Sequence, residues 1–127
     1  MTEMDTKARV QAVAAHIIRA HQTRAPFNLS AGEVPASTDE AYAVQDSVAA
    51  LWRQAGDAIC AWKTGGPNAE ATPVAAPIPQ SKLFRSPVTL HGKDFNVIGI
   101  EAELAYSLAD DLPPRATPYT EADVVAA

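Results

Sequence analysis

The sequence is poor in several features that mark particular classes of protein. A single cysteine, Cys60, excludes an internal disulfide and predicts a reducing, cytoplasmic location. Its neighbours Ile59, Ala61 and Trp62 predict a buried, inert thiol. No apolar run is long enough to cross a bilayer. Residues 1–5 lack both the basic start and the apolar core of a signal peptide.

Basic residues are also few. Ten Lys and Arg against fifteen Asp and Glu give a net charge of −5, and the basic residues form no stripe interleaved with aromatics. We therefore expect no nucleic-acid partner. What is present is a chain of 127 residues with 47% hydrophobic and 20% charged residues, which is typical of one globular domain.

Residues 1–56 are predicted to form an N-terminal helical segment. Apolar residues within 5–22 recur with the spacing of one helix face. The opposite face is expected to be polar, with Arg9, Gln11, Arg19 and Gln22. Ser37 and Glu40 have the spacing of a capping box, which predicts the start of a second helix that ends at Gly56. We expect the two helices to pack as an antiparallel pair.

Residues 57–127 are predicted to be the first part of a metal-binding β domain. Residues 58–64 (AICAWKT) indicate a strand, whereas the prolines of 71–80 exclude a helix or a central strand there. Residues 87–90 are a possible short strand, followed by a turn at 91–94. The longest strand candidate of the chain is 95–108.

A third helix is predicted to begin near Thr120. The sequence ends at Ala127, after about two helical turns, and helices this short are marginal alone. From this pattern we expect the β domain to be truncated.

Two glutamates lie in the middle of the longest strand candidate. Alternate side chains of a strand share a face, so Glu101 and Glu103 point the same way. A solvated strand face would explain them. The apolar residues that flank them on that face favour instead a covered pair, which needs a cation. A hard divalent ion would serve, because magnesium takes one or two protein carboxylates and leaves other positions to water and substrate.

Lys63 is the second candidate. It lies at the end of strand 58–64, immediately before Gly65 and Gly66. The lysine either extends its ammonium to solvent or holds it beside an anionic substrate, with the glycines permitting close backbone approach. The three histidines are expected in surface or packing roles, and the single cysteine excludes a zinc site with sulfur ligands.

These motifs resemble the 2-keto-4-pentenoate hydratase group of the fumarylacetoacetate hydrolase superfamily. The resemblance rests on three segments in order: AYAVQ at 41–45, WKTG at 62–65 and GIEAELAYSLADDLP at 99–113. It covers nearly all of this chain and about the N-terminal half of such enzymes. The sequence departs from the group at 79–81, where Pro, Gln and Ser stand near the Leu-Phe pair in place of an acidic residue and a glycine.

The resemblance implies an α+β fold, in which the helical pair is followed by the first strands of a mixed β-sandwich or roll. It implies that Glu101 and Glu103 are two of three carboxylate ligands to Mg²⁺ or Mn²⁺. The third ligand would follow the last helix of this chain. Lys63 would be a catalytic residue.

The implied reaction is the metal-dependent addition of water to a 2-hydroxy-2,4-dienoate, which gives a 4-hydroxy-2-oxo acid in the breakdown of aromatic compounds. Two alternatives remain: a 2-oxo-acid decarboxylase of the oxalocrotonate type, and a non-catalytic fragment or partner subunit that lacks the third ligand. The expected partners are a small 2-oxo or 2-hydroxydienoic acid and either further copies of the chain or a complementing C-terminal segment. No membrane partner is expected.

Overall fold

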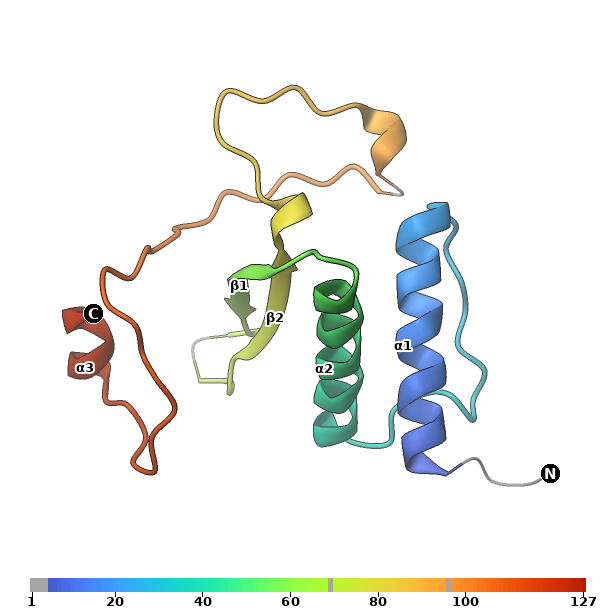
Figure 1. The fold of residues 1–127 in the computed structure, drawn as a ribbon, viewed down its shortest axis with the longest axis horizontal. Coiled ribbons are helices and arrows are strands. Elements are labelled where there is room, and N and C mark those ends of the chain that lie inside the picture. Colours follow the sequence, from blue (N-terminus) through green and yellow to red (C-terminus); the bar gives the residue numbers. More distant parts are fainter. Residues whose placement is uncertain (1–4, 69, 96) are drawn as a thin grey trace.

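The computed structural model describes residues 5–68, 70–95 and 97–127 and shows a small α+β chain (Figure 1). Residues 1–4 of the predicted helical segment and residue 96 of the predicted long strand lie outside this description. The elements in chain order are α1 (Thr6–Thr23), α2 (Thr38–Gln54), β1 (Ile59–Gly65), β2 (Val74–Pro79), two 3₁₀ turns (Gln80–Lys82 and Gly92–Asp94) and α3 (Glu121–Ala126).

The hydrophobic core lies between α1 and α2. Val10, Val13 and Ala14 of α1 pack against Val44 and Val48 of α2, and all five side chains are buried. Burying one such valine contributes about 1.5–3 kcal/mol relative to an exposed one. The predicted apolar helix faces are confirmed.

The two helices run in the same direction, so the predicted antiparallel pairing is wrong. Figure 1 shows both helices rising from the same end of the molecule. Arg9 contacts Glu40 between the first turns of the two helices, and His21 packs edge-on against Trp52 between their last turns. Each end of α1 therefore lies beside the same end of α2. The connection 24–37 makes this possible. Fully extended it could span about 46 Å, whereas the axis of α1 is only about 27 Å long.

Local signals define the two ends of α2. The Ser37 hydroxyl accepts a hydrogen bond from Glu40 N at 3.2 Å, which satisfies one free amide of the first turn. At the other end, Gly56 adopts φ +84°, and the amides of Gly56 and Asp57 donate to the carbonyls of Arg53 and Trp52. This bond pair is the Schellman motif, so the predicted stop at Gly56 is confirmed.

The Glu40 side chain does not complete the capping box. Its carboxylate accepts hydrogen bonds from Ala36 N at 2.8 Å and from Arg9 Nε at 2.5 Å. The side chains of Arg9 and Glu40 are only 14% and 6% exposed. Arg9 therefore lies at the helix–helix contact, and its predicted position on the solvent face is wrong. The spacing of residues within α1 could not show this, because the partner of Arg9 lies 31 residues away in the sequence.

The stability of the helix pair is expected to fall at acid pH because of Glu40. The hydrogen bonds from Arg9 and from Ala36 N lower the pKa of this carboxyl. A depressed pKa in the folded state contributes stability above the ordinary glutamate pKa of about 4.3, and the contribution disappears as the pH falls through the depressed value. Urea unfolding followed by circular dichroism from neutral to acid pH would measure it.

The Glu40→Gln variant should begin with a lower urea midpoint at neutral pH and show a flatter pH profile than wild type. Glu121→Gln, an exposed carboxyl on α3, is the matched control and should follow the wild-type profile. Equal profiles for Glu40→Gln and wild type would contradict the assigned role of the Arg9–Glu40 pair.

Strands β1 and β2 form an antiparallel two-stranded sheet beside α2. The predicted strand 58–64 is confirmed as β1, with an irregular register between Ile59 and Ala61. Strand β2 was not predicted, but its prolines are tolerated because a two-stranded sheet has only edge strands. Tyr42 on α2 holds the sheet by accepting a hydrogen bond from Ala75 N at 3.2 Å. Cys60 is exposed on β1, so its predicted burial is wrong.

The segment predicted as the longest strand is extended chain without a strand ladder. No part of 97–108 is in a strand, and 87–90 is likewise not a strand. Several large apolar side chains of the segment are exposed, Ile100 by 95%. The others are Val97, Ile98, Leu104, Tyr106 and Leu108. The predicted core strand is therefore wrong for the described chain, since no described segment pairs with it through backbone hydrogen bonds.

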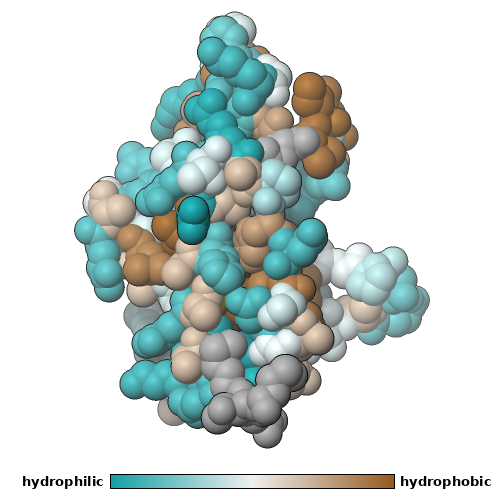
Figure 2. All heavy atoms as spheres, turned by 90° about the vertical axis from the view of Figure 1, so that its right-hand side faces the viewer, coloured by the Kyte–Doolittle hydropathy of each residue, from teal (hydrophilic) through white to brown (hydrophobic). Residues whose placement is uncertain are grey.

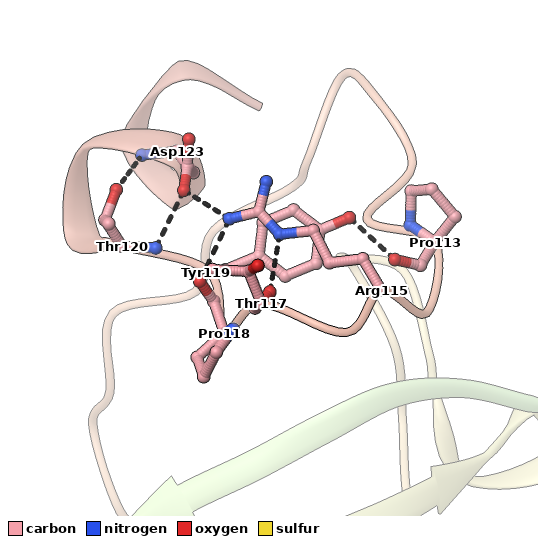
Figure 3. A network of polar contacts seen from close by, with 7 residues as sticks. All are labelled: Pro113, Arg115, Thr117, Pro118, Tyr119, Thr120 and Asp123. Carbon is pink, nitrogen blue, oxygen red and sulfur yellow. Dashed lines mark hydrogen bonds and ion pairs between the residues drawn. The ribbon is translucent and has the colours of Figure 1, made fainter.

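The predicted third helix is confirmed as α3, and Arg115 holds the loop before it (Figure 3). The Arg115 guanidinium lies 3.7 Å from the centroid of the Tyr119 ring and donates to Asp123 at 2.5 Å. It also donates to the carbonyls of residues 117–118. Thr120 and Asp123 form a complete capping box, which explains how six residues hold a helical form.

Viewed from the α1 side, hydrophilic side chains cover most of the surface, and hydrophobic ones form separate patches between them (Figure 2). Within the described residues, none of the helices combines the length and the apolar character that crossing a bilayer requires.

Candidate functional site

Lys63, Glu101 and Glu103 come together at the surface of the sheet. Lys63 Nζ donates a hydrogen bond to Glu101 Oε2 at 2.9 Å and also contacts Glu103 Oε1. The side chains of Lys63, Glu101 and Glu103 are 47%, 74% and 49% exposed. We call these three side chains the Lys63 cluster.

Two different parts of the chain supply the cluster. Lys63 lies on β1, where it pairs with Ala76 of β2, so its backbone is held by the sheet. Glu101 and Glu103 lie on the extended segment 97–108, two residues apart. Both carboxylates meet the same ammonium, as expected for alternate side chains of an extended chain. The same-side orientation predicted for the glutamates is thus present without a strand ladder.

Mutual hydrogen bonding sets the charge of the cluster. The bonds that Lys63 donates to Glu103 and Glu101 raise the pKa of its ammonium. The same bond from Lys63, with the attraction of its charge, lowers the pKa of the Glu101 carboxyl. Lys63 and Glu101 therefore both stay charged at neutral pH. Because the groups are half-exposed, the ion pairs themselves add little to folding stability.

The two carboxylates suit a hard divalent cation. Their oxygens converge on one positively charged atom, and carboxylate oxygens are the ligands that Mg²⁺ and Mn²⁺ prefer. Magnesium is commonly held by one or two carboxylates, with water and substrate oxygens at its other positions. Across 5–68, 70–95 and 97–127, no three His, Cys, Asp or Glu side chains are grouped closely enough to hold a metal ion. The cluster itself offers two carboxylates.

Space is open beside the cluster at the end of β1. A Cβ added at Gly65 would meet no other atom within 4 Å, and one at Gly66 would make only ordinary contacts, the nearest at 3.6 Å. The backbone of Gly65 pairs with Val74 of β2, and the open space lies where a side chain would stand. The predicted close approach of a substrate to the glycine pair stays a prediction.

Two of the histidines pack as predicted. His16 lies edge-on to Phe27, with ring centroids 5.4 Å apart, and its Nδ1 is 3.3 Å from Glu33. His21 packs on Trp52, and burial, together with the charge of Lys82, lowers the pKa of its imidazole. His91 is exposed at the turn before Gly92–Asp94.

A cavity of about 440 Å³ lies away from the Lys63 cluster. Its walls are formed by residues 17–27, from the second half of α1 and the start of the connection after it, and by segment 82–95. An ion pair of 2.8 Å between Arg24 and Asp94 joins these two segments. None of the three cluster residues lines the cavity. Sequence spacing held no signal for this cavity, because its walls are about 70 residues apart in the chain.

All three residues of the Lys63 cluster are predicted site residues, but the sequence does not show the contact among them. It predicts Lys63 beside a substrate and the two glutamates on a metal. The direct contact spans 38 and 40 residues, so no local motif could show it. The available signal for this contact was that Lys63 and the two glutamates carry opposite charges in two otherwise apolar segments.

We found no match to this chain among protein-family models, curated proteins or solved structures.

Proposed function

We propose that this chain carries part of a divalent-metal site of an enzyme that adds water to a 2-hydroxy-2,4-dienoate. The product would be a 4-hydroxy-2-oxo acid. The observation that carries the proposal is the convergence of Glu101 and Glu103 on one cation, the Lys63 ammonium. The three motifs that resemble the hydratase group support the same residues.

The proposal gives each residue of the Lys63 cluster a role. Glu101 and Glu103 would hold Mg²⁺ or Mn²⁺, and the bound ion would supply Lewis-acid polarisation of the 2-oxygen of the substrate. Lys63 would bind the substrate carboxylate with its ammonium, because its Nζ already lies beside the two metal-binding carboxylates. The open space at Gly65 would admit the substrate next to Lys63.

The proposal also extends to the fold around segment 97–108. We infer that segment 97–108 becomes a strand of a larger mixed β-sandwich or roll. The exposed Ile100 and Leu104 support this, because large apolar side chains gain free energy when another segment covers them. Either further copies of the chain or a complementing C-terminal segment would supply that cover and the third ligand.

The exposed apolar side chains also favour a second candidate function. A non-catalytic partner subunit would use segment 97–108 for association, with Glu101 and Glu103 paired permanently to Lys63. An oxalocrotonate-type decarboxylase is the alternative within the enzymatic proposal, because it would use the same two carboxylates.

Product analysis separates these functions. The chain is incubated with 2-hydroxypenta-2,4-dienoate or with 2-oxohex-3-enedioate, and with Mg²⁺, Mn²⁺ or EDTA. Metal-dependent formation of 4-hydroxy-2-oxopentanoate supports the hydratase, and release of carbon dioxide from the diacid supports the decarboxylase. No turnover of either substrate, together with no binding of Mn²⁺, would favour the partner subunit.

A further inference from the structure

Lys63 already occupies the place of a cation between the two carboxylates. Its Nζ is 2.9 Å from Glu101 Oε2 and also touches Glu103 Oε1. We propose that Lys63 is an internal counter-cation that a divalent ion must displace from Glu101 and Glu103. Metal binding and release of the Lys63 ammonium would then be one coupled event. This inference rests on the proposed metal site and adds the way in which that site is controlled.

The competition follows from shared ligand oxygens. Magnesium binds carboxylate oxygens at about 2.1 Å, so an ion held by both glutamates would lie in the space that the ammonium now fills. Two positive charges in contact repel each other, and the carboxylates cannot serve both cations with the same oxygens. The divalent ion carries the larger charge and therefore displaces the Lys63 ammonium when its concentration is high enough.

The structure makes displacement of Lys63 easy. All three side chains are about half-exposed or more, so their ion pairs are screened by water and weak. Lysine holds its charge on a flexible four-carbon stem, and the Lys63 side chain is 47% exposed, so its ammonium can move from the carboxylates into solvent. A lysine released in this way stays within reach of the metal and is free to pair with an anionic substrate.

Without the metal, the same lysine would keep the two carboxylates together. Two unpaired carboxylates two residues apart would repel each other, and the ammonium between them removes that repulsion. The site would then be preformed in the metal-free chain, but its affinity for the divalent ion would be lower. Removing the ammonium should therefore tighten metal binding.

The test compares Mn²⁺ binding by wild type and the variants Lys63→Met, Lys63→Arg and Lys7→Met. Free Mn²⁺ is measured by its electron paramagnetic resonance signal during titration of the 127-residue chain. Lys63→Met removes the charge and should bind Mn²⁺ about tenfold more tightly than wild type, the effect of removing one screened contact charge beside two ligands. Lys63→Arg keeps the charge and should bind no more tightly than wild type. Lys7→Met makes the same charge change on an exposed site of α1 and should match wild type.

Equal or weaker binding by Lys63→Met than by wild type would overturn the inference while leaving the metal site in place. Absence of Mn²⁺ binding in wild type and all variants would instead overturn the proposed metal site, and the inference with it. Tighter binding by Lys7→Met to the same degree as by Lys63→Met would also overturn the inference, because net charge alone would then explain it. Circular dichroism of α1 and α2 confirms that each variant is folded.

Discussion

The Glu101→Gln/Glu103→Gln variant is expected to lose Mn²⁺ binding and, with it, metal-dependent turnover. Glutamine keeps the size of the side chain and one carbonyl oxygen, but it removes the negative charge that a hard cation requires. The loss of affinity should exceed the roughly 10–100-fold cost of removing a group that merely supports a metal ligand. Titration calorimetry with Mn²⁺ and product formation from the dienoate measure the two effects.

Asp110→Asn/Asp111→Asn is the matched control for this double substitution. It removes two negative charges from adjacent exposed residues of the same C-terminal part of the chain. We expect this variant to bind Mn²⁺ as wild type does. If it loses binding and the Glu101/Glu103 variant retains it, the ligands have been assigned to the wrong acidic pair.

The Val13→Asp variant is expected to lose the helical structure of the α1–α2 pair. Val13 is 2% exposed and lies in the cluster that joins the two helices. A carboxylate buried there without a partner costs several kcal/mol, a large part of the total of about 5–15 kcal/mol that stabilises a folded domain. Far-ultraviolet circular dichroism should show the loss directly.

Two further variants make the Val13 prediction quantitative. Val13→Ala removes two carbons without adding charge and should lower the free energy of unfolding by about 2 kcal/mol. Val125→Asp introduces the same charge at an exposed valine of α3 and should leave the circular dichroism of the helix pair unchanged. A normal helical spectrum for Val13→Asp would show that the core has been placed on the wrong face of α1.

The helices were predictable because their signals are local. Apolar spacing placed Val10 and Val13 on the buried face of α1, and Ser37 marked the start of α2. The left-handed conformation required at the end of α2 suits glycine, so Gly56 was a reliable stop. Each signal lies within a few residues of the feature that it predicts.

Features that depend on distant partners were not predictable. The parallel direction of the helices follows from the path of the long connection 24–37, which no periodic pattern describes. Arg9 has a position typical of a solvent face, yet it pairs with Glu40 from another helix. Segment 97–108 has the composition of a strand, but a strand also needs a neighbour, and composition does not supply one.

The candidate site was predictable only in part. The alternation of Glu101 and Glu103 correctly placed both carboxylates on one side of an extended chain. The flanking apolar residues predicted a covered pair, whereas Glu101 is 74% exposed. The contact with Lys63 required knowledge of how segment 97–108 passes β1. The structure therefore brings Glu101, Glu103 and Lys63 into contact, and their roles in a site stay predictions.

The most direct test of this account is to locate bound Mn²⁺ in the isotope-labelled chain by paramagnetic line broadening in nuclear magnetic resonance spectra. Substoichiometric Mn²⁺ broadens the signals of side chains that lie close to it. We predict that the side-chain signals of Glu101, Glu103 and Lys63 disappear first, while those of Asp110 and Asp111 persist. Broadening centred on any other residues, or uniform broadening with no preferred position, would contradict the assignment of Glu101 and Glu103 as a divalent-metal site.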